Sequence, residues 1–162
     1  MSANAQPQWI WTPEKTAERN AFVRFRKVFQ WNGERTDIRV TGDSVYVLFV
    51  NGQYVGQGPI RSWPFKRKYD TYDITPYLQT GKNVLAVRVQ HYGVGTFQYN
   101  CGPAGLWVRL QTGDVTLVSG PDWKTSIDPA FATLTPRISI QQAYEEQYDA
   151  RRADGWQHVD YD

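Results

Sequence analysis

Residues 46–56, YVLFVNGQYVG, carry the strongest structural signal in this chain. An Asn-Gly pair stands between two runs that are rich in β-branched and aromatic residues. A type I′ turn needs positive φ at both of its central residues, and Asn followed by Gly adopts that conformation readily. The stretch therefore predicts a tight β-hairpin that turns at Asn51 and Gly52.

Alternating segments continue on both sides of this hairpin. Residues 21–29 alternate apolar side chains with Arg24 and Arg26, and Lys27 on the apolar face predicts a strand end or a bulge. Further strands are expected at 9–11, 36–40, 84–89, 106–110, 115–118 and 137–140. Residues 141–152 suit a helix or a strand, and alternation favours extended structure at 143–149. About ten short strands, turn signals every 8–12 residues and no long helix predict an all-β fold, an antiparallel β-sandwich.

Composition excludes several classes of protein. The 162 residues suit one domain, and the net charge of +2 is too small for a nucleic-acid-binding surface. No apolar run approaches the ~20 residues of a membrane span. Cys101 is the one cysteine, so no internal disulfide is expected. Residues 1–8 are expected to be a disordered segment without signal-peptide features, which favours the cytoplasm while leaving localisation open.

Two loops rich in aromatic and hydrogen-bonding residues are candidate binding sites. Aromatic rings pack on the C–H faces of sugars, and arginine holds their hydroxyl groups. The first candidate site comprises Arg61, Trp63, Tyr69 and Tyr72, and the second comprises His91, Tyr92, Phe97, Gln98 and Tyr99. The alternative for Tyr69 and Tyr72 is packing on a sheet face, and the alternative for the second loop is a long connection that its own aromatic residues stabilise.

Acidic residues give little sign of a metal or catalytic site. Asp70 and Asp73 are candidate ligands of a structural calcium ion, but no segment has the spaced carboxylates of a dedicated calcium loop. Glu145 and Glu146 are adjacent and would point to opposite faces of an extended segment, so they do not form a glycosidase pair. No catalytic triad, metal-ligand spacing or phosphate-binding glycine loop is visible.

An ordered series of short motifs resembles a known family. The motifs are FRKVF at 25–29, LFVNG at 48–52, GP at 58–59, RSWP at 61–64, YDTYDIT at 69–75, HYGVGTFQY at 91–99, PRIS at 136–139 and EQYDAR at 146–151. The series is similar to the N-terminal β-sandwich of bacterial α-L-rhamnosidase-like glycoside hydrolases of family 78, a galactose-binding-like jelly roll. It covers residues 9 to 160, and the hairpin alone also resembles the sugar-binding domain of β-galactosidase-like enzymes.

The resemblance implies a domain at 9–162 that is a fragment of a larger enzyme. Such enzymes carry their catalytic carboxylates on a separate (α/α)-barrel domain, so no catalytic residue is expected here. The implied function is a non-catalytic accessory module that binds a rhamnose-containing or galactoside-like carbohydrate. The alternatives are a purely structural domain that packs on the catalytic barrel, and a glycosidase in its own right.

Overall fold

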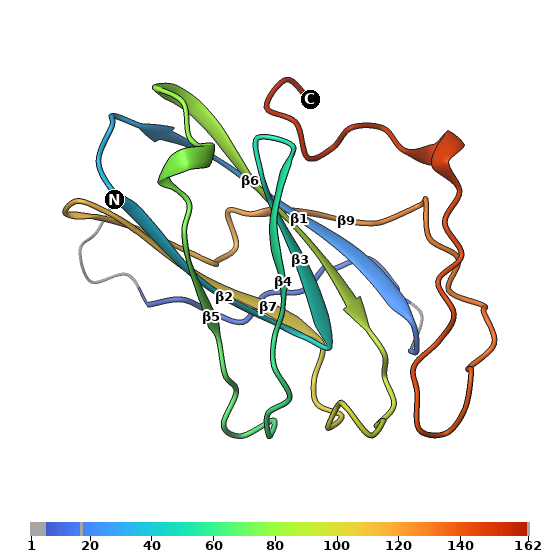
Figure 1. Cartoon of the computed structure of the whole chain (residues 1–162). Coiled ribbons are helices and arrows are strands. Elements are labelled where there is room, and N and C mark those ends of the chain that lie inside the picture. Colours follow the sequence, from blue (N-terminus) through green and yellow to red (C-terminus); the bar gives the residue numbers. More distant parts are fainter. Residues whose placement is uncertain (1–5, 17, 162) are drawn as a thin grey trace.

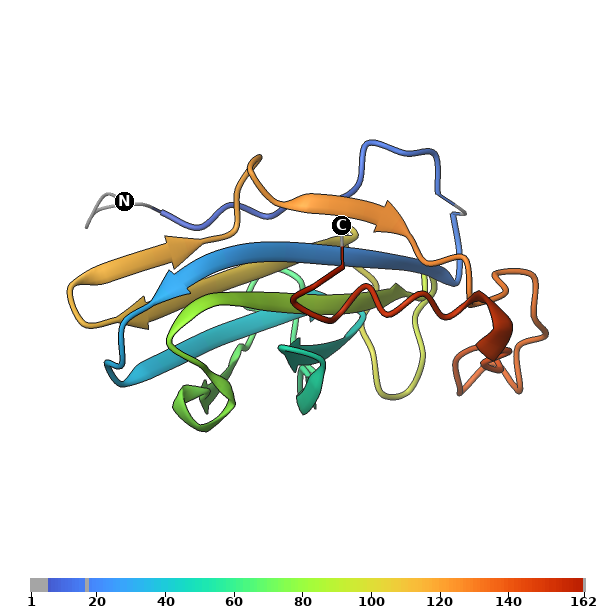
Figure 2. The same ribbon diagram turned by 90° about the horizontal axis from the view of Figure 1, so that it is seen from above.

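The computed structural model describes residues 6–16 and 18–161, and it consists of two antiparallel sheets (Figures 1 and 2). The five-stranded sheet has the order β4 (Gln53–Gly58), β3 (Val45–Val50), β6 (Gly81–His91), β1 (Ala21–Trp31) and β9 (Lys124–Ile127). The four-stranded sheet has the order β5 (Asp70–Asp73), β2 (Thr36–Asp43), β7 (Gly105–Thr112) and β8 (Val115–Val118). Two 3-10 turns, Thr75–Tyr77 and Ala150–Arg152, complete the regular structure of the described residues. The predicted antiparallel β-sandwich is confirmed.

The core lies between the two sheets. Alternate residues of the inner strands point inward, as the sequence pattern predicts, and they are buried, whereas the edge strands β5 and β9 have no buried residue. The five-stranded sheet contributes Val23, Phe25, Leu48 and Val87, and the four-stranded sheet contributes Ile38, Val40, Val108 and Leu110. Burying each such side chain stabilises the fold by about 1.5–3 kcal/mol.

The hairpin at Asn51 and Gly52 forms as predicted. Their φ angles are 51° and 83°, and Val50 pairs with Gln53. The Asn51 side chain also accepts a hydrogen bond from the Val84 backbone N–H at 2.9 Å, so the turn is attached to β6. The turn residue therefore serves both local and long-range structure.

The predicted interruption at Lys27 is wrong. β1 continues to Trp31 and stays in unbroken register with β6. Lys27 is accommodated because its long stem carries the ammonium group to the Asp122 carboxylate at the sheet edge. The register irregularity lies instead between Leu48 and Phe49 of β3.

Two predicted strands and one predicted extended segment form only isolated bridges. Segment 9–11 contributes one bridge, from Ile10 to Leu106. Segments 137–140 and 143–149 are joined by the bridge Arg137–Tyr144, and Tyr148 forms a second bridge with Phe131. The segment that follows β9 folds back on itself instead of adding to a sheet edge. A segment with an alternating pattern becomes a strand only if another strand pairs with it, and the local sequence does not show whether such a strand lies nearby.

A C-terminal strap, defined as residues 150–161, crosses the outer face of the five-stranded sheet (Figures 1 and 2). Arg24 pairs with Asp128 at 2.7 Å and with Asp154 at 2.8 Å. Arg26 donates to the strap carbonyls of Trp156 at 3.2 Å and Tyr161 at 2.8 Å. The two outward arginines of β1 therefore hold the strap on the sheet.

The N-terminal segment is described from residue 6 onward, so most of the expected disordered segment at 1–8 lies outside the described residues. Gln8 is attached to the domain, because its N–H donates to the Ser119 carbonyl at 2.9 Å. No helix of the described residues is long and apolar enough to span a membrane.

Candidate functional site

Three loops meet at one end of the sandwich, at the bottom of Figure 1. They are residues 59–69 between β4 and β5, residues 92–104 between β6 and β7, and residues 128–149 after β9. Asn100 connects the first two, since its side chain donates to the Ser62 carbonyl at 3.4 Å and lies 3.5 Å from Arg61. Arg137 connects the second and third by donating to the Gly95 carbonyl at 2.6 Å. We call this surface the loop end.

A buried carboxylate anchors the loop end. Asp43 ends β2 and is fully buried. Arg67 of the first loop donates to Oδ2, whereas Tyr99 of the second loop donates to Oδ1. His91 Nδ1, at the end of β6, lies 2.9 Å from the same Oδ1. A buried charge is costly unless it is paired and hydrogen-bonded, and these three donors satisfy it.

The protonation states around Asp43 follow from burial. Burial lowers the pKa of His91, and the charge of Arg67 lowers it further. The contact with Asp43 acts in the opposite direction, because it favours the protonated ring. In either protonation state, Nδ1 carries the hydrogen that it donates to the carboxylate. Burial likewise raises the pKa of Tyr99, so its hydroxyl stays protonated and acts as a donor.

A cleft of about 340 Å³ opens between the first two loops, above Asp43. Four of the nine residues predicted for ligand binding line it, namely Arg61, Tyr92, Gln98 and Tyr99. Ser62 and Arg67, which were not predicted, add further hydrogen-bonding groups to its wall. The volume lies in the range of small-molecule sites, and the wall combines aromatic rings with polar groups.

The other predicted residues lie outside this cleft. Trp63 and Phe97 are exposed at the loop end, and Trp63 stacks on Phe65 with 6.0 Å between ring centroids. Tyr69 stacks on Trp107, and the Tyr72 hydroxyl lies 3.0 Å from that of Tyr46. These two tyrosines pack on the sheet, which is the alternative that the sequence left open.

His91 also faces away from the cleft. Its ring contacts Trp11 edge-on at 6.1 Å, and its Nδ1 is engaged by Asp43. The structure therefore places His91 beneath the cleft as a support for the second loop.

The loop end exposes an unusual number of large apolar side chains. Besides the tyrosines Tyr69 and Tyr148, seven of them lie on its three loops: Ile60, Trp63, Phe65, Phe97, Leu134, Ile138 and Ile140. Their exposed fractions run from 58% for Trp63 to 96% for Leu134. Large exposed apolar patches mark interaction surfaces in soluble proteins. Sequence reasoning missed the four aliphatic members, because the alternation of Ile138 and Ile140 was interpreted as a strand and Ile60 and Leu134 belong to no periodic pattern.

The calcium candidates engage protein groups instead. Asp70 accepts a hydrogen bond from Tyr46, and Asp73 accepts one from the Thr75 backbone N–H at 3.0 Å. Within residues 6–16 and 18–161, no group of three or more His, Cys, Asp or Glu side chains is arranged to hold a metal ion. The calcium site stays a prediction.

Comparison with known proteins decides the family. The sequence profile of the α-L-rhamnosidase N-terminal domain matches residues 32–162. The chain belongs to this family. The resemblance that the motifs predicted is thereby confirmed. The profile begins after β1, but β1 is a central strand of the sandwich and is part of the same folded unit.

Rhamnosidases are among the similar proteins. An α-L-rhamnosidase of Streptomyces avermitilis is 31% identical over 144 residues, which cover 79% of this chain and 13% of that protein. The family 78 rhamnosidase of Bacillus sp. GL1 is 37% identical with a TM-score of 0.90, covering 98% of this chain and 17% of that one. This chain therefore spans less than a fifth of either relative.

The fold is shared more widely. A lectin of Pleurotus ostreatus has a TM-score of 0.54 at 22% identity, covering 86% of this chain and 38% of the lectin. At this identity the likeness concerns the fold alone.

Proposed function

We propose that this chain is a non-catalytic accessory module of an α-L-rhamnosidase-like glycoside hydrolase, and that its loop end docks against the catalytic part of that enzyme. The supporting observation is the group of seven exposed apolar side chains on the three loops. Four of them are aliphatic, and aliphatic side chains suit a protein interface better than a sugar site, where aromatic rings and hydrogen-bonding groups are needed.

The loop end is preorganised for docking. The side chains of Arg67, His91 and Tyr99 converge on Asp43, and Asn100 and Arg137 connect neighbouring loops. A surface that is ordered before association loses less conformational entropy when it binds. The family relation supports the choice of partner, because most of each related rhamnosidase lies outside the part that this chain matches.

The docking proposal predicts separate effects on the chain and on its parent enzyme. The double variant Leu134→Ser with Ile140→Ser removes two side chains that are 96% and 78% exposed. The isolated chain should keep its thermal midpoint, whereas the parent enzyme should lose about 2 kcal/mol of domain-docking free energy per side chain. Calorimetry should then show this domain unfolding separately.

The control is Val115→Ser, which changes an exposed valine at the start of β8, near the turn between β7 and β8. It should leave both the chain and the enzyme unchanged. Unaltered docking in the double variant, or equal destabilisation of the isolated chain, would contradict the proposal.

The cleft between the first two loops supports a second candidate function, weak carbohydrate binding. Arg61, Gln98 and Tyr92 face a space of about 340 Å³. Among the described residues, the Arg61 guanidinium has only a long contact, 3.5 Å to Asn100, and so keeps donors for sugar hydroxyl groups. A rhamnose-containing or galactoside-like sugar is the proposed ligand.

A chemical-shift titration tests the cleft. L-rhamnose, D-galactose and a rhamnose-containing disaccharide should each be added to the ¹⁵N-labelled chain. Saturable shifts at Arg61, Tyr92 and Gln98 are expected, and Arg61→Ala should abolish them while Arg35→Ala, at an exposed arginine beside β2, should not. Spectra that stay unchanged at high sugar concentration would exclude the carbohydrate-binding function.

A further inference from the structure

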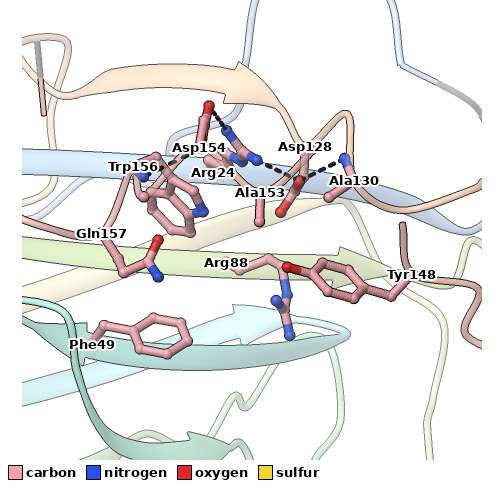
Figure 3. Close-up of a pocket in the computed structure, with 11 residues that line it drawn as sticks. Arg24, Phe49, Arg88, Asp128, Ala130, Tyr148, Ala153, Asp154, Trp156 and Gln157 are labelled. Atoms are coloured by element: carbon pink, nitrogen blue, oxygen red, sulfur yellow. Dashed lines mark hydrogen bonds and ion pairs between the residues drawn. The ribbon is translucent and has the colours of Figure 1, made fainter. Parts of the chain in front are cut away.

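A second pocket lies on the outer face of the five-stranded sheet, beneath the C-terminal strap (Figure 3). Its volume is about 60 Å³, and it is separate from the cleft at the loop end. β1 contributes Arg24, β6 contributes Arg88, and the segments after β9 contribute Asp128, Tyr148, Asp154 and Gln157.

The charged groups of this pocket are unequally paired. Arg24 forms ion pairs with both carboxylates of the pocket, Asp128 at 2.7 Å and Asp154 at 2.8 Å. Asp128 also accepts from the Ala130 backbone N–H at 3.0 Å. Within the part of the chain that the structure describes, Arg88 has no carboxylate within 4.0 Å, and its guanidinium makes no hydrogen bond. The two arginines and two aspartates of the lining balance in charge, and Arg88 is the arginine that has no ion-pair partner among the described residues.

The surroundings of Arg88 favour an anion. Its guanidinium lies over the Phe131 ring, 4.3 Å from the centroid, and is only partly exposed. Burial lowers the pKa of Arg88. The charges of Asp128 and Glu146, which lie beyond ion-pair distance, partly offset this by raising it. An arginine stays charged even so, and a desolvated, unpaired charge is unfavourable until a counter-charge reaches it.

Two neutral side chains point into the same space. Tyr148 directs its hydroxyl toward Arg88, and the Gln157 amide projects from the strap (Figure 3). A planar carboxylate matches the guanidinium fork and accepts further hydrogen bonds from a hydroxyl and an amide. The volume admits a few water-sized groups, so a carboxylate fits and a whole sugar ring does not.

We propose that this pocket binds the carboxylate of a sugar acid, with Arg88 as its cationic partner and Tyr148 and Gln157 as hydrogen-bond donors. The sugar ring remains outside, against the half-exposed ring of Tyr148, which is 52% exposed at the rim. The ligand class is therefore a uronic acid unit of a glycan. The proposal does not depend on docking of the loop end.

The test compares three ligands by chemical-shift titration of the whole chain at constant ionic strength. D-glucuronate should produce saturable shifts of the Arg88 Nε–H and Gln157 amide signals. D-glucose, which lacks the carboxylate, should produce none, and acetate should bind more weakly than D-glucuronate. Equal responses to glucose and glucuronate would overturn the carboxylate site, and acetate that binds as tightly as glucuronate would overturn the sugar-acid assignment.

Variants test the assigned residues. Arg88→Gln should weaken glucuronate binding by about tenfold or more, because charge-assisted hydrogen bonds are lost. Arg39→Gln is the matched control, since Arg39 also lies over an aromatic ring, that of Tyr69, on the other sheet. Tyr148→Phe removes one hydroxyl without altering charge and should weaken binding a few-fold, with thermal unfolding verifying that both variants fold. Unchanged binding in Arg88→Gln and Tyr148→Phe would overturn the proposal.

Discussion

At the scale of single residues, Asp43 is the group on which the loop end depends. Besides the adjacent Ser44 hydroxyl at 3.5 Å, its three donors lie 24, 48 and 56 residues away in the chain. Sequence analysis predicted the role of Asn51 and Gly52, because a tight turn is encoded by adjacent residues. The role of Asp43 was not predictable in this way, because nothing local shows that Arg67, His91 and Tyr99 converge on it.

Asp43→Asn should destabilise the chain strongly. The amide is similar in size, but it leaves the Arg67 guanidinium without its anion, and breaking a buried ion pair in this way costs about 3 kcal/mol. Chemical denaturation measures the loss. Asp37→Asn on the same strand is the control, because Asp37 and Arg35 lie 3.6 Å apart with largely exposed side chains. Such pairs contribute about 0–1 kcal/mol, so equal losses in the two variants would contradict the role given to Asp43.

At the scale of elements, the strap determines the environment of β1. The alternation of residues 21–29 correctly placed Arg24 and Arg26 on the outer face. The sequence did not predict that both would be buried, because the covering segment comes about 130 residues later. The strand predicted at 137–140 failed for the same reason, since no sheet of the described residues includes it, and the extended segment 143–149 makes isolated bridges only.

Attachment of the strap should weaken in acid. Burial works to raise the pKa of Asp154, but the hydrogen bond and charge of Arg24 outweigh it and lower the pKa below 3.8. A lowered carboxylate pKa stabilises the folded state above the unfolded pKa, and this contribution is lost as the pH falls through the lowered value. We therefore expect the strap to loosen below about pH 4.

The indole N–H signal of Trp156 reports this change, because Trp156 lies in the strap over Arg24. Its signal should move with decreasing pH in the natural chain. In Asp154→Asn it should already be displaced at neutral pH and should titrate less. An identical titration in Asp154→Asn and the natural chain would show that another group controls the strap.

At the scale of the whole molecule, the sandwich presents one ordered and apolar end. Strand count and turn spacing were sufficient to predict the two-sheet fold, because most core strands have an alternating pattern and β6 has a continuous apolar run. The short motifs were sufficient to predict the family. The apolar surface was not predictable, because it combines side chains from three loops that are separated by tens of residues.

Amide hydrogen exchange provides the most direct measurement of docking. The chain should be compared alone and as part of its complete parent enzyme. We predict that residues 60–65, residue 97 and residues 134–140 exchange more slowly in the enzyme, because the catalytic part covers them there. Equal exchange at these three places in both samples would contradict docking through the loop end. Protection that is absent, or confined to the outer face of the four-stranded sheet, would be such a result.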